Sequence, residues 1–144
     1  GRAELRPGVR ELISAAGEAG VRLAIATTTS LPNVDALLQA AYNGSRNGIF
    51  EAICAGDSVA AKKPAPDIYL DALRQLDLPP DACLAIEDSR NGLMSALKAG
   101  ISTIVTPGIY TEGQDFSEAE LVVPDLNSVA IAELLSGRLT HESR

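Results

Sequence analysis

Tryptophan is absent from this sequence, and aromatic residues together make up only 3% of its 144 positions. Proteins that stack nucleic-acid bases need aromatic platforms, so this scarcity argues against that class. Positive charge is also in deficit, because 12 lysines and arginines stand against 19 aspartates and glutamates, a formal net charge of −7. We therefore expect no nucleic-acid partner and no anionic membrane partner, since both are usually bound through basic surfaces.

Long apolar runs are missing as well. None reaches the ~20 residues that a membrane-spanning helix needs, and the N-terminal stretch has no signal-peptide core. We expect a cytoplasmic protein without a membrane span. Its two cysteines, Cys54 and Cys83, lie inside apolar runs and are expected to be buried and reduced. The 46% of hydrophobic residues is enough for the core of one domain.

Short apolar runs alternate with segments of helical periodicity. The strand-like runs are 22–28, 51–55, 83–86, 102–105 and 121–123. The helical segments are 7–19, 32–42, a helix opened by Pro66, 91–99 and 128–136. This alternation predicts an α/β fold, a Rossmann-like three-layer sandwich with a parallel sheet between helices. Residues 1–136 are expected to form this core domain, and residues 137–144 a polar tail.

Ligands of such sheets bind beyond the carboxyl ends of the strands, so polar residues there are the candidate site. The first strand runs into Thr27, Thr28, Thr29 and Ser30. Hydroxyls and backbone N–H groups at a helix start suit an oxyanion. The competing interpretation is simple capping of the following helix.

Two further segments carry polar residues of the same kind. Lys63 is followed by Pro64, which favours an extended backbone at the lysine, and its ammonium could neutralise a phosphate. The alternative is that Lys62 and Lys63 are solvated surface lysines. Glu87 and Asp88 directly follow a buried strand, where hard oxygen ligands suit Mg²⁺, with Asp88 as the direct ligand and Glu87 in support. Their alternative is a capping aspartate beside a solvated glutamate.

Together these groups predict a site for a phosphate and a divalent cation. Phosphoryl transfer needs mainly positioning and neutralisation of charge, which a lysine, hydroxyls and Mg²⁺ supply. One component is missing, because the sequence contains no Asp-x-Asp and no aspartate ending the strand before Thr27 that could serve as nucleophile.

The three segments, in this order, resemble motifs of the haloacid dehalogenase superfamily, within its CbbY-like, beta-phosphoglucomutase-like branch. Residues 23–29 (LAIATTT) are similar to the second motif, residues 63–69 (KPAPDIY) to the third, and residues 86–92 (IEDSRNG) to the fourth. The resemblance implies catalytic roles for Thr27 and Lys63. It also implies phosphate or substrate binding by Thr27, Thr28, Lys63 and Asn33, and Mg²⁺ binding by Glu87 and Asp88.

The resemblance further implies a Mg²⁺-dependent phosphatase of phosphorylated sugars, with xylulose-1,5-bisphosphate as the favoured substrate and an aspartyl-phosphate intermediate. In the family, an Asp-x-Asp motif and a helical cap domain precede the region matched here. We therefore expect a C-terminal part of such an enzyme, inactive by itself. The first-motif strand would lie between the strands ending at Thr27 and at Glu87, so its absence predicts a gap. That gap would be closed directly, filled by a strand from a partner chain, or completed by a missing N-terminal segment.

Other functions stay open at this stage. A sugar phosphomutase of the same branch would share these residues, and a non-catalytic phosphate-binding or regulatory module would explain the missing nucleophile. A dinucleotide-binding domain is disfavoured, because no Gly-x-Gly-x-x-Gly follows the first strand. The single histidine, His141, lies in the polar tail and has no expected role in catalysis.

Overall fold

The structure, a computed structural model, describes residues 11–13, 22–27, 50, 52–56, 59–108 and 111–124. Its strands are β1 (Ala24–Ala26), β2 (Ala52–Cys54), β3 (Leu84–Glu87), β4 (Ser102–Val105) and β5 (Leu121–Val122). Its helices are α3 (Asp67–Leu76), α4 (Arg90–Lys98) and the short 3₁₀-helix η2 (Pro80–Ala82), and residues 11–13 are also helical. Each predicted strand is present. The predicted helices over 32–42 and 128–136, most of the helix over 7–19 and the tail over 137–144 lie outside the described residues.

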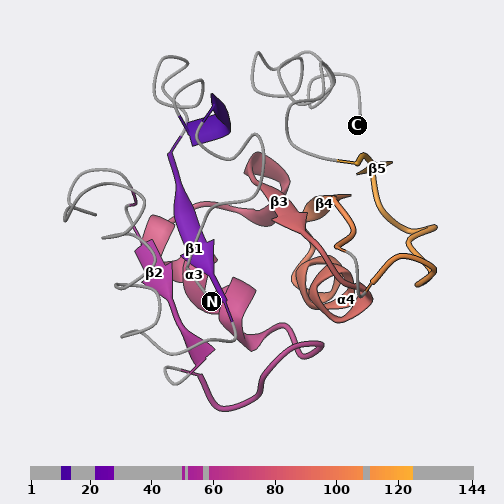
Figure 1. Cartoon of the computed structure of the whole chain (residues 1–144). Coiled ribbons are helices and arrows are strands. Elements are labelled where there is room, and N and C mark those ends of the chain that lie inside the picture. The colour runs from indigo at the N-terminus through magenta and orange to yellow at the C-terminus, as the bar shows by residue number, and fades with distance from the viewer. Residues whose placement is uncertain are drawn as a thin grey trace, which may run out of the picture.

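All strand pairs are parallel, but the strands fall into two groups. β1 pairs with β2, and separately β3 pairs with β4, which pairs with β5. Figure 1 shows β1 beside β2, and β3 beside β4 with α4 against that pair. Within the described part of the chain, β1 and β3 are not hydrogen-bonded to each other. The predicted gap is therefore present there, and direct pairing of these two strands does not close it.

Apolar clusters cover both faces of the group β3–β4–β5 and one face of the pair β1–β2, as in an α/β fold. On one face α3 contacts β1 and β2, α4 contacts β3 and β4, and the two helices contact each other. Ile68, Ala85 and Ala96 are buried in the cluster between them. On the other face, Ile104 and Val123 form a second cluster, against which Leu12 of the helical residues 11–13 packs. The predicted α/β class is confirmed.

Side chains along β3 alternate between these faces, and this alternation decides where its last residue points. Ala85 belongs to the cluster beneath α3 and α4, while Leu84 and Ile86 pack on the opposite cluster. Since strand residues two apart share a face, Glu87 points to the same side as Ala85. The carboxylate therefore enters the layer of α3 and α4, and Asp88 follows the end of the strand.

Local signals fix the ends of the two helices. Ser89 caps α4, because its hydroxyl accepts a hydrogen bond from the backbone N–H of Gly92 at 3.1 Å. The helix begins one residue earlier than predicted, at Arg90. Asp77 ends α3 in the left-handed conformation at φ 56°, and its N–H bonds carbonyls of the last turn.

The cysteines are free, as predicted, but only Cys54 is fully buried, and Cys83 keeps partial exposure because it precedes β3. None of the helices in the described ranges combines the length and the apolar character needed to cross a membrane.

Candidate functional site

Lys63 joins the two groups of strands at the gap between them. Its Nζ donates to the backbone carbonyl of Ala26, the last residue of β1, at 3.2 Å. The same atom lies 2.5 Å from Oε2 of Glu87, the last residue of β3. The side chains of this ion pair are only 11% and 7% exposed. The ammonium group is therefore held at the carboxyl ends of both strands, next to Thr27 and next to Asp88.

Tyr69 of α3 contacts both members of this ion pair. Its hydroxyl donates a short hydrogen bond to Oε2 of Glu87, and the Lys63 ammonium lies 5.3 Å from the centre of its ring. Burial, and then the negative charge of Glu87, raise the pKa of Tyr69 well above its usual value. The hydroxyl therefore stays protonated and remains a donor to the carboxylate at physiological pH.

The loop that carries Lys63 is fastened to both helices. The buried Ser95 hydroxyl of α4 donates to the carbonyl of Ala65 at 2.7 Å. The carboxylate of Asp67, at the start of α3, accepts from the backbone N–H of Ala61 at 3.3 Å. The Lys63–Pro64 peptide bond is cis. Lys62, by contrast, is exposed. The two adjacent lysines thus occupy different environments, and only Lys63 faces the strand ends.

Asp88 stands in an exposed turn beside the ion pair. The hydroxyl of Thr111 donates to its backbone carbonyl at 2.6 Å and accepts from the N–H of Gly108 at 2.8 Å. Its negative charge contributes to the raised pKa of Tyr69, although less than Glu87 does. Because Ser89 caps α4, the alternative in which Asp88 is the helix cap is not what the structure shows.

The segment after β4 is bound to the start of α4 through Arg90. The guanidinium contacts Glu118 at 2.9 Å and the carbonyl of Asp115 at 2.7 Å, and the Arg90 N–H donates to the Gln114 side chain at 2.8 Å. The hydrogen bond with Arg90 holds the pKa of Glu118 below its usual value. Together with the Thr111 bond, these contacts fix the turn at Asp88 against the segment between β4 and β5.

The carboxylates of the site supply part of a divalent-cation site. Asp88 is an exposed hard oxygen donor of the type that Mg²⁺ prefers. Oε2 of Glu87 already contacts both Lys63 and Tyr69. Across the described residues, no group of three or more histidine, cysteine, aspartate or glutamate side chains is arranged to hold a metal ion. The donors thus fit a Mg²⁺ ion only if further ligands join Asp88.

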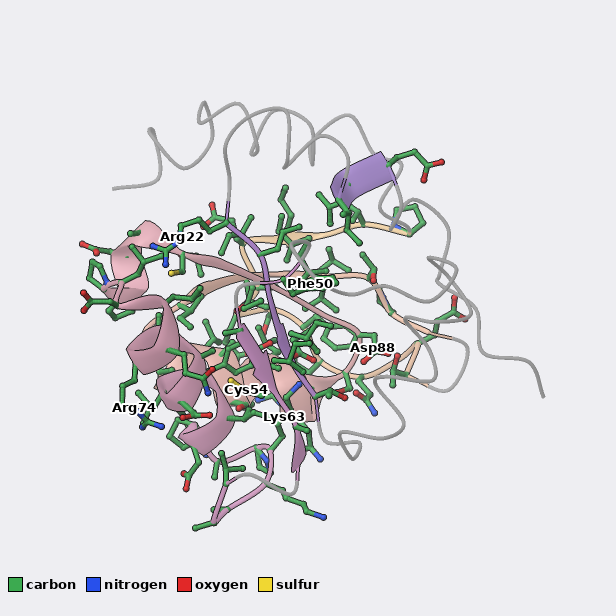
Figure 2. The ribbon with its side chains drawn as sticks, turned by 90° about the vertical axis from the view of Figure 1, so that its left-hand side faces the viewer. Arg22, Phe50, Cys54, Lys63, Arg74 and Asp88 are labelled. Atoms are coloured by element: carbon green, nitrogen blue, oxygen red, sulfur yellow. The ribbon has the colours of Figure 1, made fainter. Side chains whose placement is uncertain are left out.

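Cysteine chemistry is disfavoured at Cys54, which lies on β2 (Figure 2). The Cys54 side chain is fully buried in β2, and burial together with the neighbouring Asp71 raises its pKa to about 12. A thiol with such a pKa is almost entirely protonated at neutral pH, so it is a poor nucleophile.

Of the sequence-predicted residues, the structure brings Lys63 and Glu87 into direct contact. Thr27 lies directly after β1, its N–H bonded to the Cys54 carbonyl at 2.9 Å, and Lys63 contacts the residues that precede Thr27 and Asp88. Thr28 and Asn33 lie outside the described residues. The catalytic, phosphate-binding and metal-binding roles of all these residues stay predictions.

Sequence reasoning missed the residues that support the site. The sequence patterns predict no individual role for Tyr69, Gly92, Ser95, Thr111 or Gln114, although Tyr69 and Gly92 end the segments that resemble the third and fourth motifs. For Ser95 a signal existed, because it is a hydroxyl flanked by the apolar positions Leu93 and Ala96 of a predicted helix. Thr111 and Gln114 lie in a segment without periodicity, where no pattern singles out a residue.

The chain is similar in sequence and in fold to proteins named CbbY. A protein named CbbY from Rhodobacter capsulatus is 57% identical over 130 residues, covering 90% of this chain and 57% of that protein. The crystal structure of CbbY from Rhodobacter sphaeroides in complex with phosphate matches with a TM-score of 0.86 and 48% identity, over 92% of this chain and 60% of that one. A mutant of the same protein in complex with xylulose-(1,5)bisphosphate matches with a TM-score of 0.85 and 49% identity, over 90% and 59%.

This chain thus spans a little over half the length of these relatives. The family described as haloacid dehalogenase-like hydrolase matches residues 1–100, well over half of the sequence. The match includes all three strand-end segments with Thr27, Lys63 and Asp88. The chain belongs to the haloacid dehalogenase-like hydrolase family.

Proposed function

We propose that this chain is the phosphate-binding half of a Mg²⁺-dependent sugar-phosphate phosphatase, with xylulose-1,5-bisphosphate as substrate. The observation that carries the proposal is the position of Lys63. Its ammonium reaches the carbonyl before Thr27 and the carboxylate before Asp88, so three segments distant in sequence meet at one edge of the strands. The likeness to CbbY, solved with phosphate and with this bisphosphate, supports the choice of substrate.

Each residue would have a distinct task. The Thr27 hydroxyl and the Lys63 ammonium would bind the transferred phosphoryl group, and Lys63 would offset the negative charge that builds up on its oxygens. Thr28 and Asn33 would contact the substrate. Lys63 is paired with Glu87, and it would exchange part of this contact for a contact with the phosphate of the bound substrate. Such a site positions the phosphoryl group and lowers the barrier mainly through electrostatics.

Mg²⁺ would be held by Asp88, with Glu87 in support and further ligands from outside the described residues. When bound, the ion would neutralise charge on the phosphoryl oxygens. The attacking aspartate would come from an Asp-x-Asp segment, either on a longer form of this protein or on a strand-completing partner chain. The aspartate would displace the sugar oxygen from phosphorus, the departing oxygen would take up a proton to leave as the sugar alcohol, and water would then hydrolyse the aspartyl-phosphate to free phosphate and the aspartate. We therefore expect the 144 residues alone to show no turnover.

The decisive experiment measures release of inorganic phosphate from xylulose-1,5-bisphosphate by the longer protein that carries the Asp-x-Asp segment. We expect Mg²⁺-dependent release that EDTA abolishes. Lys63→Ala should lower kcat/KM by about 10²–10³-fold, as removal of one oxyanion-stabilising donor does. Lys62→Ala is the matched control, because Lys62 is the exposed neighbour of the same type, and it should retain activity.

Three results would contradict the proposal. Equal losses in Lys62→Ala and Lys63→Ala would remove the assigned role of Lys63. Conversion of a hexose 1-phosphate to its 6-phosphate without release of inorganic phosphate would identify a phosphomutase. A longer protein that binds phosphate but releases none from any sugar phosphate, with or without Mg²⁺, would identify a non-catalytic binding module.

A further inference from the structure

The carboxylate of Glu87 is enclosed by three separate elements. Its Oε2 contacts Lys63 from the loop before α3 and the hydroxyl of Tyr69 from α3. Its other side faces the first turn of α4, at Gly92. The residue is only 8% exposed. The carboxylate therefore has few alternative positions that keep its two partners.

Gly92 has no side chain where any other residue would meet this carboxylate. A Cβ atom at Gly92 would lie 1.8 Å from Oε1, 2.3 Å from Cδ and 3.0 Å from Cγ of Glu87. The backbone itself does not require glycine here. Among the described glycines, positive φ angles occur at Gly100 and Gly113, and not at Gly92. The space taken by Glu87 is therefore the steric reason for glycine at this position.

We propose that Gly92 is a positioning residue, which leaves room for the Glu87 carboxylate and through it sets the position of the Lys63 ammonium. With a Cβ in place, the carboxylate must move from its present position, which disturbs its contacts with Lys63 and Tyr69. The ammonium keeps its bond to the Ala26 carbonyl, but its ionic partner is displaced. The steric part of this inference is independent of the reaction, and its meaning for catalysis rests on the proposed function.

The sign of the stability change caused by Gly92→Ala distinguishes this role from that of an ordinary helix position. Alanine is a better helix former than glycine, so Gly92→Ala at an unconstrained site should stabilise the protein. We expect the opposite, because the new methyl group displaces a buried, paired carboxylate. In a Glu87→Ala background the obstacle is gone, and the same substitution should be neutral or stabilising. Such a reversal is the signature of a direct interaction in a double-mutant cycle.

The experiment uses the 144-residue chain, its two single variants Gly92→Ala and Glu87→Ala, and the double variant. Urea unfolding gives the midpoint of each. Competitive amine labelling with acetic anhydride, read by mass spectrometry, gives the ratio of Lys63 to Lys62 modification. Lys62 is the internal control because it is exposed and adjacent. We expect Gly92→Ala in the wild-type chain to lower the urea midpoint and to raise the labelling ratio several-fold. In the Glu87→Ala background, the same substitution should neither lower the midpoint nor raise the labelling ratio.

A higher midpoint with an unchanged ratio in Gly92→Ala would overturn the inference, as would equal losses in both backgrounds. If Gly92→Ala alone does not fold, the double variant must fold, and its failure to do so would also overturn the inference. Neither measurement needs phosphate, Mg²⁺ or turnover. The proposed function can therefore fail while this result stands, and a longer protein that hydrolyses its substrate normally with Gly92→Ala would leave the steric finding but remove its catalytic meaning.

Discussion

Ser95 shows how much one buried hydroxyl contributes to the placement of Lys63. The side chain is fully buried in α4, and it donates to the carbonyl of Ala65, two residues beyond the lysine. Without Ser95, the partly buried carbonyl of Ala65 would lose this donor, and a polar group left unsatisfied away from water costs free energy. The bond therefore stabilises the fold and also fixes the loop in which the candidate catalytic lysine lies.

We expect Ser95→Ala to lower the free energy of unfolding by about 1–3 kcal/mol, the usual cost of an unsatisfied buried polar group. The matched control is Ser102→Ala, because Ser102 is exposed on β4 and an exposed substitution usually changes stability by less than about 0.5 kcal/mol. Urea unfolding of both variants measures the difference. Equal effects of the two substitutions would show that the bond to Ala65 does not stabilise the loop.

The ion pair between Lys63 and Glu87 is a second residue-level contribution to stability. Both side chains are largely buried, and removal of one partner of a buried ion pair typically costs about 3–5 kcal/mol. We expect Glu87→Gln, which keeps the shape and removes the charge, to destabilise the protein by up to that amount, with thermal unfolding as the measurement. The exposed Glu112→Gln is the control, and a similar small effect for both would mean that water screens the pair.

At the scale of elements, the segment between β4 and β5 acts as a clamp on the start of α4. Thr111 bonds the Asp88 carbonyl, and Arg90 bonds Glu118 and the carbonyl of Asp115. All of these contacts join neighbours of Asp88 to residues more than twenty positions later in the chain. The clamp thus fixes a turn whose own sequence contains no rigid residue such as proline.

The clamp has a pH dependence with a defined sign. Arg90 holds the pKa of Glu118 below its usual value, so the carboxylate is more stable in the folded state than in the unfolded one. The contribution is fully present above the ordinary glutamate pKa of about 4.3 and is lost as the pH falls below it. We expect the stability difference between wild type and Glu118→Gln to shrink on acidification through that range, as measured by urea unfolding at a series of pH values. A difference that grows on acidification would contradict this assignment.

The Glu118 contact is exposed, and salt should therefore weaken it. Glu120→Gln is the control in the same segment, since Glu120 is exposed and has no ion pair among the described contacts. We expect Glu120→Gln to change the free energy of unfolding by less than about 0.5 kcal/mol, as exposed substitutions usually do.

At the scale of the whole molecule, the two groups of parallel strands are separated at the position where the resemblance predicts the first-motif strand. β1 and β3 each pair on one side only within the described residues. Lys63 crosses this gap with one hydrogen bond and one ion pair. Side-chain contacts of this kind connect the groups, but they do not satisfy the strand edges as a central strand would.

Open strand edges are templates for pairing with other chains. We expect the isolated 144-residue chain to associate increasingly as its concentration is raised, and the longer protein with the Asp-x-Asp segment to remain a defined species with a higher urea midpoint. Sedimentation velocity over a concentration series measures the first, and unfolding measures the second. A chain that stays monomeric and equally stable without the segment would contradict the expected strand-completing role.

The sequence by itself determined the α/β class, the succession of strands along the chain and the three polar segments at the strand ends. These follow from local patterns, namely apolar runs, helical periodicity and turn residues, which neighbours in the chain impose on each other. It also distinguished Lys63 from Lys62 through a motif. Only the tertiary structure decided that Lys63 bonds the ends of both β1 and β3, that Tyr69 and Gly92 enclose Glu87, and that Ser89 rather than Asp88 caps α4. Those contacts depend on how separate elements pack, and a long-range steric fit leaves no periodic trace in the residues that make it.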